Sequence, residues 1–559
     1  MSMMTSVPAM AIRTAATLLL GIWAGWLTMR YNMHMFQLNV YMNGEQKAWI
    51  KKNLRLQWIL WFAMLLGIIR MFVPLVILDV LCWLTLIVII LVYRVMREMH
   101  QKKKLVFTAR VKRMVATICV ISILLMIAAY YMGGTGMAGR VGAAAGTKSY
   151  TSAFIIGGLS ALSGMITFLV GAQLSMNMIA NVINKPIEKG VNNHYINDAK
   201  RILAGMPDLT IIGVTGSYGK TSVKFFLQTL LQQHFSVLVT PESYNTPMGI
   251  VKTIRGQMKA THQIFVCEMG ARYVGEIKEI CDIVHPHHGV ITSIGPQHLD
   301  TFGGIENVKS TKFELADAVP DGGMLFLNGD NEYINDYIRE TGTKDDTKEK
   351  IYYFSEGSGE GYTASDISVS NLGTEFTVTA PNGETERYQM KLIGAHNVIN
   401  VMGAVAVAHS FGISLHELKI PVRRLRPVKH RMEMKDNGSV TIIDDAFNSN
   451  PIGSKAAVET LALFDGMRIL ITPGMVELGP DEDEYNRRFG TYAAECCDRI
   501  LLVGRRHTEP IKEGALSKGF DPKNLMAFDK VEDAIAYAYQ IRTGEHKYIL
   551  LENDLPDNY

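Results

Sequence analysis

The sequence of 559 residues has few cysteines, little net charge and no internal repeat, and each absence removes a class of function. Its six cysteines form no disulfide framework and have no spacing typical of zinc ligands, so reduced thiols in a cytosolic environment are expected. A formal net charge of +3 does not indicate binding to nucleic acid or to a strongly acidic partner. Because no repeat or low-complexity segment occurs, a repeat architecture is not indicated either.

Long apolar runs, in contrast, are frequent in the first third of the chain. Up to about Val182 the sequence is dominated by Leu, Ile, Met, Ala and Trp, whereas the remainder has the composition of an ordinary globular protein. A run of roughly 20 apolar residues is long enough to span a bilayer. Candidate spans occur at 10–28, 57–93, 114–132 and 153–182. The first run lacks a small-residue cleavage site, so an uncleaved helix is predicted and not a signal peptide.

The run at 57–93 is long enough for two spans, and the charges around it decide its interpretation. Lysine and arginine residues lie on both sides of it, within 47–55 and 97–113. Since basic loops remain on the cytoplasmic side, the run is predicted to be a hairpin that turns between Arg70 and Pro74. This interpretation gives about five transmembrane helices in total. The N-terminus and the loop at 133–150 are then outside, and everything after about 183 is inside. Arg70 and Asp79 are interpreted as an interfacial arginine and a tolerated aspartate, with a buried functional pair as the alternative.

The stretch TIIGVTGSYGKTSVKFF, residues 210–226, has the order of a strand, a glycine loop and a helix. Such a loop turns backbone N–H groups toward phosphate oxygens, a lysine adds charge near the terminal phosphates, and a following hydroxyl holds magnesium. The strict eight-residue form of the motif is not met, because Val214 occupies the position of its first glycine. The predicted ligands are ATP and Mg²⁺, and the predicted nucleotide-binding residues are Gly216, Ser217, Gly219, Lys220, Thr221 and Ser222.

Six further motifs follow this loop in a fixed order. They are TPESYNTPMGI (240–250), IFVCEMGARYVGEI (264–277), VITSIGPQHLDTFGGIENVKSTKFEL (290–315), FLNGDN (326–331), LIGAHNVINVMGAVAVAHSFGI (392–413), and HRMEM with TIIDDAFNSNPIGSKAAVETL (430–461). Together with the loop they resemble the Mur ligase family, the ATP-dependent amide ligases of peptidoglycan precursor synthesis, and in particular its MurF-like, D-alanyl-D-alanine-adding members. The resemblance covers about 205–480.

The resemblance implies a multi-domain fold. We expect an N-terminal α-helical transmembrane bundle at 1–185, an α/β P-loop Mur ligase central ATP-binding domain at 186–417, and a C-terminal Rossmann-like α/β domain at 418–559. Alternating residues within 350–391 predict a small antiparallel element, and four strand-like segments between 440 and 552 alternate with helical patterns. Soluble members of the family begin with a small domain that grips a UDP-sugar peptide, and apolar helices replace it here.

A ligase of this kind transfers the terminal phosphate of ATP to a carboxylate, and an amine then attacks the acyl phosphate. Because the carboxylate and the triphosphate repel each other, the site needs a metal ion and lysines. The resemblance implies that Lys220, Lys312 and His298 are catalytic, that Thr221, Glu268 and His298 bind Mg²⁺, and that Lys312 matches the lysine carbamylated in family members. The alternatives are a capping carboxylate, a hydrogen-bonded histidine and a solvated lysine, with Lys309 as a possible misalignment of Lys312.

Four more positions are assigned to the nucleotide by the resemblance. Asn245 and Asn331 correspond to positions on the adenine side, while Arg431 and Asp445 resemble residues of the C-terminal domain that reach the phosphates and ribose when the domains close. Each of the four could instead be a turn or cap residue. The HNVIN signature at 396–400 links the site to a helix, and HPHH at 285–288 is interpreted as a turn before a buried strand and not as a metal site.

These motifs predict a membrane-anchored, ATP-dependent carboxylate–amine ligase of the bacterial inner membrane, with its catalytic domains in the cytoplasm. The expected partners are ATP, a carboxylate-bearing cell-envelope precursor or polymer that a lipid link would hold at the membrane, an amino acid or peptide amine, and the membrane, but no nucleic acid. The alternative is a P-loop ATPase that drives a transporter or polymer exporter, although neither an ABC-type signature nor a polar membrane path is found. The segment LLENDLPDNY lacks the lysine–glycine–serine element usual in MurF, which leaves the amino substrate open.

Overall fold

The computed structural model describes residues 6–98, 104–141, 146–242, 244–341, 347–356, 359–447, 449–505 and 507–554 of the chain. These residues form two compact units, of which the first ends at Asn192 and the second begins at Asn193. Helix α7 (Gln173–Ala204) passes from one unit into the other, so the predicted boundary at 185 falls inside a helix.

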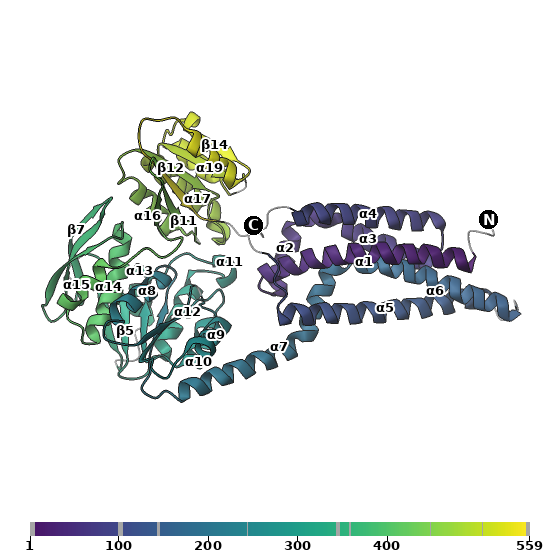
Figure 1. Ribbon diagram of the computed structural model, residues 1–559, viewed down its shortest axis with the longest axis horizontal. Coiled ribbons are helices and arrows are strands. Elements are labelled where there is room, and N and C mark those ends of the chain that lie inside the picture. The colour runs from purple at the N-terminus through teal and green to yellow at the C-terminus, as the bar shows by residue number, and fades with distance from the viewer. Residues whose placement is uncertain are drawn as a thin grey trace. The chain divides into compact units, whose positions relative to one another are not determined.

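The first unit is a bundle of long helices, drawn in purple to blue in Figure 1. The helices before α7 are α1 (Val7–Leu38), α2 (Asn43–Lys52), α3 (Leu54–Phe72), α4 (Val76–Glu98), α5 (Ala109–Val141) and α6 (Gly146–Gly171). Among the described residues, α1, α4, α5 and α6 are long and apolar enough to cross a membrane, and the bent pair α2 and α3 is a further candidate. The prediction of about five helices of membrane-spanning length is consistent with this count.

Two of the predicted spans are interrupted. The run at 57–93 forms two helices that meet near the predicted turn between Arg70 and Pro74. Helix α3 ends at Phe72, α4 begins at Val76, and the two helices pack against each other. The run at 153–182 is not one helix, since α6 ends at Gly171 and α7 begins at Gln173. Gly171 packs so closely on α3 that a Cβ there would lie 2.4 Å from the Leu60 carbonyl oxygen. The break is a single residue, since Ala172 N–H donates to the Phe168 carbonyl at 2.9 Å and Met176 N–H to the Ala172 carbonyl at 2.9 Å.

Arg70 and Asp79 form a fully buried ion pair, as the alternative interpretation held, whereas a function for the pair stays a prediction. Arg70 Nε donates to Asp79 Oδ1 at 2.6 Å, and Arg13 Nη1 donates to Asp79 Oδ2 at 3.0 Å. Arg70 also donates to the hydroxyl of Ser160 on α6. Residues from α1, α3, α4 and α6 therefore enclose the carboxylate and neutralise it within the bundle.

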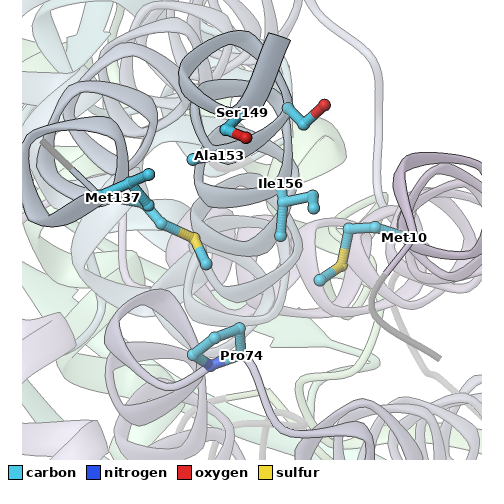
Figure 2. Close-up of a pocket in the computed structure, with 8 residues that line it drawn as sticks. Met10, Pro74, Met137, Ser149, Ala153 and Ile156 are labelled. Carbon is cyan, nitrogen blue, oxygen red and sulfur yellow. The ribbon is translucent and has the colours of Figure 1, made fainter. Parts of the chain in front are cut away.

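A cavity of about 590 Å³ lies in the same bundle. It is shown in Figure 2, and its lining residues are Met10, Pro74, Met137, Val141, Ser149, Ser152, Ala153 and Ile156. Met10 joins the cavity wall to the buried ion pair, because its sulfur accepts a hydrogen bond from Arg70 Nη2 at 3.5 Å. All eight lining residues are uncharged, so the cavity does not form the ordered series of ionisable groups expected of an ion path.

The second unit contains a nine-stranded sheet in the order β2-β3-β1-β4-β5-β6-β7-β8-β9. Its strands are β1 (Thr210–Thr215), β2 (Val237–Val239), β3 (Ile264–Glu268), β4 (His288–Ile291), β5 (Met324–Asn328), β6 (Glu349–Phe354), β7 (Tyr362–Ser370), β8 (Gly373–Thr379) and β9 (Thr385–Met390). Neighbours from β2 to β7 are parallel, and β7, β8 and β9 are antiparallel. The antiparallel element predicted within 350–391 is therefore confirmed for β7 to β9, whereas β6 extends the parallel part.

Helices cover this sheet on both faces. Their bounds are α8 (Lys220–Leu231), α9 (Pro247–Gln257), α10 (Glu276–Val284), α11 (Leu299–Phe302), α12 (Ile305–Ala318), α13 (Glu332–Thr341), α14 (Ala395–Ser410) and α15 (Leu415–Arg423). Apolar residues of α8 and α14 share one core with the strands, and those of α9 and α10 share another. Helix α15 packs against β9 and α8, so the predicted division at 417/418 cuts a helix of the central domain.

A second sheet follows, with six strands in the order β10-β11-β15-β12-β13-β14. The strands are β10 (Glu433–Asp436), β11 (Val440–Asp445), β12 (Met467–Thr472), β13 (Arg499–Val503), β14 (Leu525–Phe528) and β15 (Lys547–Glu552). Among the described strands of this second sheet, only β10 pairs in an antiparallel manner, and the other neighbours are parallel. The α-helices of this domain are α16 (Pro451–Leu461), α17 (Glu482–Cys496), α18 (Glu509–Ser517) and α19 (Val531–Gln540). The predicted doubly wound C-terminal domain is thus present.

Strand register brings the predicted site together. The neighbouring strands β3, β1 and β4 are parallel, and Val214 on β1 lies opposite Glu268 on β3, while Thr215 lies opposite Ile291 on β4. The segments that follow these strands therefore leave the sheet at the same carboxyl edge, where open α/β sheets bind ligands.

Candidate active site

The phosphate loop connects β1 to α8, and close contacts require its glycines. A Cβ on Gly216 would lie 2.1 Å from Thr292 Oγ1, and one on Gly219 would lie 2.3 Å from Asn400 Oδ1. The φ angles of Gly216 and Gly219 are 152° and 78°, values that residues with a Cβ rarely adopt. Asn400 belongs to the HNVIN segment at the start of α14, so the predicted link between that helix and the loop is observed.

Lys220 and the two hydroxyl residues after it open helix α8. Lys220 Nζ folds back over the loop and donates to the carbonyls of Gly216 and Ser217 at 2.5 and 3.0 Å. Burial lowers the pKa of Lys220 to about 8, although the charge of Glu268 opposes the shift. Thr221 Oγ1 donates to Glu268 Oε1 at 3.0 Å, and Ser222 is buried in the same helical turn. A charged lysine and a hydroxyl thus lie where a nucleotide phosphate and its metal would need them.

Glu268 lies at the carboxyl end of β3 and is almost fully buried. Its Oε1 also accepts from Asn245 Nδ2 at 3.1 Å, and Lys224 Nζ lies 3.0 Å from its Oε2. Burial alone would raise the pKa of Glu268, but Lys224 and Lys220 outweigh burial and hold it below its ordinary value. The sequence interpretation put Asn245 on the adenine side, whereas the structure places its amide against this carboxylate.

The donors around Glu268 fit a magnesium ion. Mg²⁺ prefers oxygen ligands, and Thr221 supplies a hydroxyl beside the Glu268 carboxylate. Glu268 Oε2 is buried and accepts no hydrogen bond among the described residues, because the Lys224 ammonium approaches it outside hydrogen-bond geometry. A metal ion at this carboxylate would therefore share it with the Lys224 ammonium, 3.0 Å from Oε2.

His298 follows β4 and contacts a residue of the C-terminal domain. Its Nδ1 is hydrogen-bonded to the Glu477 carboxylate, and the other Glu477 oxygen lies 2.6 Å from Arg272 Nη2. Burial lowers the pKa of His298, and Glu477 acts in the opposite direction. The charge of Lys312 also acts on His298, so these two predicted residues lie in one electrostatic environment.

Lys312 is buried in α12, and among the described residues its ammonium has no hydrogen-bond or ion-pair partner. It is 2% exposed, and burial together with the charge of Lys220 lowers its pKa to about 7. Lys309, the alternative alignment, instead pairs with Glu306 at 2.9 Å and with Glu340 at 3.9 Å. Lys312, and not Lys309, is therefore the unpaired buried lysine of α12, and the charge of Lys220 acts on it.

Arg431 and Asp445 lie in the C-terminal domain at the side that meets the phosphate loop. Arg431 Nη2 donates to Thr221 Oγ1 at 3.3 Å, and its guanidinium lies 4.8 Å from the centre of the Phe447 ring. Asp445 Oδ1 accepts from the Met432 N–H at 3.1 Å, and burial raises the pKa of Asp445 to about 6. The Phe447 ring thus packs against the Arg431 guanidinium.

The Asn331 side chain is hydrogen-bonded to backbone groups of the central domain. Its Nδ2 donates to the Ile294 carbonyl at 3.0 Å, and its Oδ1 accepts from the Ile334 N–H at 3.1 Å. Contact of Asn331 with an adenine ring stays a prediction. His287 and His288 accept hydrogen bonds from backbone N–H groups through Nδ1, each at 3.0 Å, which agrees with a turn and not with metal ligation.

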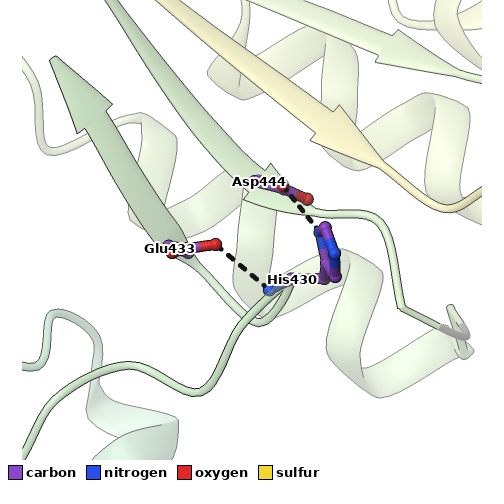
Figure 3. A group of neighbouring side chains, drawn as sticks. All are labelled: His430, Glu433 and Asp444. Atoms are coloured by element: carbon purple, nitrogen blue, oxygen red, sulfur yellow. Dashed lines mark hydrogen bonds and ion pairs between the residues drawn. The ribbon is translucent and has the colours of Figure 1, made fainter.

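The C-terminal domain also contains a cluster that the sequence did not predict. His430, Glu433 and Asp444 are close enough to share a metal ion, and Figure 3 shows the imidazole of His430 turned toward Asp444. However, Lys435 Nζ already lies 2.6 Å from Asp444 Oδ2 and 3.3 Å from Glu433 Oε2. The lysine neutralises both carboxylates, so we assign no metal to this cluster.

Three residues that sequence reasoning missed contribute to the site. Lys224 lies one helical turn after Lys220, so its position on the same face of α8 was a usable signal. Arg272 and Glu477 come from segments more than 200 residues apart, and no local pattern connects them. Only the fold shows that they meet at His298.

Comparison with known proteins identifies the family to which the two domains belong. The model of the Mur ligase middle domain matches residues 214–408, and that of the Mur ligase, glutamate ligase domain matches residues 430–552. The UDP-N-acetylmuramoyl-tripeptide–D-alanyl-D-alanine ligase of Buchnera aphidicola is 30% identical over 337 residues, which cover 60% of this chain and 70% of that protein. The chain belongs to the Mur ligase family. It is thus a member of a family of ATP-dependent acid–amino-acid ligases.

Other Mur ligases match over the same region. The enzyme of the same name from Escherichia coli is 30% identical, and the match covers 53% of this chain and 65% of its relative's length. MurF from Acinetobacter baumannii has the same fold, with a TM-score of 0.59, 24% identity, and coverage of 65% of this chain and 77% of that one. MurF from Thermotoga maritima, solved in complex with ADP, gives a TM-score of 0.57 at 22% identity, with coverage of 65% and 80%. The central and C-terminal domains are therefore Mur ligase domains in fold.

Proposed function

We propose that this chain is a membrane-anchored, MurF-like ligase that uses ATP to join an amine to a carboxylate on a cell-envelope precursor or polymer. The observation that supports the proposal most is the environment of Lys312, which is buried, is acted on by the charge of Lys220, and has no hydrogen-bond or ion-pair partner among the described residues. Burial of an unpaired ammonium is costly, and a lysine with a pKa of about 7 is largely neutral at slightly alkaline pH. A neutral amine in this position can react with carbon dioxide to give the carbamate that the Mur mechanism uses.

Each residue of the site has a defined task in this reaction. Lys220 and the loop N–H groups orient the triphosphate of ATP and neutralise its charge. Thr221, Glu268, His298 and the Lys312 carbamate would hold Mg²⁺, which lowers the repulsion between the phosphates and the acceptor carboxylate. An oxygen of that carboxylate attacks the terminal phosphorus, and ADP leaves. The amine nitrogen then attacks the acyl carbon, loses a proton, and releases phosphate.

The N-terminal helices are proposed to anchor the ligase in the bacterial inner membrane. Their length and apolar composition support this assignment, and the basic segments on both sides of 57–93 favour the cytoplasmic side for the ligase domains. An anchored ligase would act on a precursor held at the membrane, and a lipid-linked carboxylate is the substrate class that this placement favours. The names of the relatives support a peptide or amino-acid amine as the second substrate.

The test compares wild type with Lys220→Ala in the purified full chain. Lys220 faces the phosphate loop and not a hydrophobic core, so its removal should abolish ADP formation while thermal unfolding stays close to that of wild type. Membrane extracts should supply the acceptor, and amide formation with radiolabelled D-alanyl-D-alanine or single amino acids should require ATP. ADP release that is coupled to export of a polymer, without any amide product, would support the transporter alternative instead.

A further inference from the structure

Two residues of the C-terminal domain contact two of the predicted magnesium ligands of the central domain. Arg431 Nη2 donates to Thr221 Oγ1 at 3.3 Å, and the Glu477 carboxylate is hydrogen-bonded to His298 Nδ1. The family resemblance assigned Arg431 to the phosphates and ribose and not to Thr221, and nothing in the sequence assigned a role to Glu477. The metal site is therefore in contact with both domains.

Glu477 is fixed by three groups of the central domain. Its Oε2 meets His298 Nδ1, its Oε1 lies 2.6 Å from Arg272 Nη2, and its backbone carbonyl accepts from the Leu299 N–H at 3.0 Å. His298 and Glu477 both have left-handed backbone conformations, with φ of 52° and 65°. Such conformations cost on the order of 1 kcal/mol or more in non-glycine residues and persist where their surroundings hold them. The contact is therefore specified by both chain segments and not by the side chains alone.

The hydrogen bond at Nδ1 decides what the other ring nitrogen can do. When Nδ1–H donates to a carboxylate, the proton is held there and Nε2 keeps its lone pair for a metal ion. His298 Nε2 has no hydrogen-bond partner among the described residues. A carboxylate that fixes the ring and its tautomer in this way typically changes metal affinity by 10- to 100-fold.

We propose that Glu477 is a positioning residue that holds His298 with Nε2 presented to magnesium, so that the C-terminal domain completes the metal site of the central domain. The proposal rests on the proposed function, because that function supplies the metal. Glu477 does not act as a base for the incoming amine, since His298 and Arg272 already occupy its two oxygens. Docking of the C-terminal domain and tight metal binding are then one event.

The test measures metal binding and not turnover. Mn²⁺ replaces Mg²⁺, and free Mn²⁺ is followed by electron paramagnetic resonance during titration of the full chain in detergent with saturating ADP. Glu477→Ala should weaken Mn²⁺ binding about 10- to 100-fold. Glu477→Gln keeps a side-chain oxygen that can accept from Nδ1–H, so its loss should be smaller. A plain structural contact predicts equal Mn²⁺ affinity in the wild type and in both variants.

The chain offers a matched control. Glu482 also lies in the C-terminal domain and also pairs with a histidine, since its Oε1 is 2.9 Å from His507 Nδ1, but neither residue contacts a predicted metal ligand. Glu482→Ala should therefore bind Mn²⁺ as wild type does. If folded Glu477→Gln and Glu477→Ala bind Mn²⁺ as tightly as wild type does, the role of Glu477 is overturned while the proposed function stands. A wild-type chain that binds ADP but no Mn²⁺ would overturn the proposed function as well.

Discussion

Lys224 Nζ and Glu268 Oε2 lie 3.0 Å apart, and neither side chain is more than 1% exposed. Lys224 neutralises the carboxylate to which the Thr221 hydroxyl donates. Lys224 also donates to the Glu242 carbonyl, so the ammonium links α8 to the segment after β2. The carboxylate predicted to hold magnesium is therefore part of the folded core as well as of the site.

Lys224→Ala should destabilise the ligase domains, because it leaves the Glu268 carboxylate buried without its ion partner. Breaking a buried pair in this way costs about 3–5 kcal/mol. The measurement is the thermal transition that ADP shifts upward, since that transition reports the nucleotide-binding part of the chain. Lys252→Ala, which removes an exposed lysine, is the control and should change this transition little. Equal midpoints for the two variants would show that the pair does not stabilise the fold.

Membrane topology follows from the basic segments on both sides of the α3–α4 hairpin. A reporter fused near Lys104 should be cytoplasmic, and one fused near Gly142 should be outside. Gly142 lies outside the described residues, so this expectation rests on the charge pattern and not on the structure. Alkaline phosphatase and green fluorescent protein fusions at the two positions give opposite readouts. Two fusions on the same side would contradict the hairpin arrangement with about five crossings.

Glu552 at the end of β15 should make stability decrease as the pH rises. Burial raises the pKa of Glu552 to about 8, and its carboxyl oxygens accept from Thr472 at 2.8 Å and from Ser449. The folded state therefore keeps a proton that the unfolded chain loses near the ordinary pKa of a glutamate. The contribution of Glu552 to stability is complete below that ordinary pKa and decreases as the pH rises toward the folded-state pKa. Glu552→Gln removes this proton exchange.

The variant should consequently unfold at a higher temperature than wild type at the alkaline end of the range, with the difference shrinking toward acid. A window of about pH 6.5–8.5 separates Glu552 from Asp445, because the raised pKa of Asp445 is only about 6. Parallel melting curves of wild type and variant across this window would mean that Glu552 does not titrate there. Thr472→Val, which removes one donor to the carboxyl, should steepen the pH dependence.

The sequence predicted those parts of the fold and site that local patterns encode. The strand, glycine loop and helix around Lys220 form one continuous stretch, and parallel strand ends bring Glu268 to the same edge, so both could be placed without coordinates. The buried pairing of Arg70 with Asp79 was only the alternative interpretation, because whether a charge is buried depends on the neighbouring helices α1 and α6. The one-residue break between α6 and α7 could not be predicted either, because the run at 153–182 contains no proline or charged residue that would mark it.

Domain contacts were the least predictable part. Glu477 lies in a loop after β12, and its sequence surroundings resemble any turn rich in glycine and proline. Its partners His298 and Arg272 become neighbours only when two separately folded sheets meet. Arg431 could be predicted because a family motif contains it. Lys224 could have been predicted from its position one helical turn after Lys220 on the same face of α8. The resemblance therefore supplied the predicted nucleotide and metal residues, and the structure added the residues that contact them.

Lys312 separates the Mur mechanism from a generic ATPase, and its variants should behave accordingly. If its carbamate is a negative ligand of magnesium, Lys312→Ala loses several kcal/mol of transition-state stabilisation, on the order of a thousandfold in rate. Formate or acetate should partly restore amide formation by occupying the vacated space. Lys309→Ala is the matched control, because that lysine pairs with Glu306 on the same helix, and it should retain most of the activity.

The pH profile gives an independent measurement on the same residue. Only the neutral amine of Lys312 reacts with carbon dioxide, and its pKa is lowered to about 7, so wild-type activity should rise as the pH increases through neutrality. Added bicarbonate should raise activity most at the acidic end of the profile, where little neutral amine is present. Lys312→Ala supplied with acetate has no amine to deprotonate and should lack both effects. Wild-type activity in the unsupplemented variant would eliminate the carbamate role, because no lysine would then be needed beside the phosphate loop.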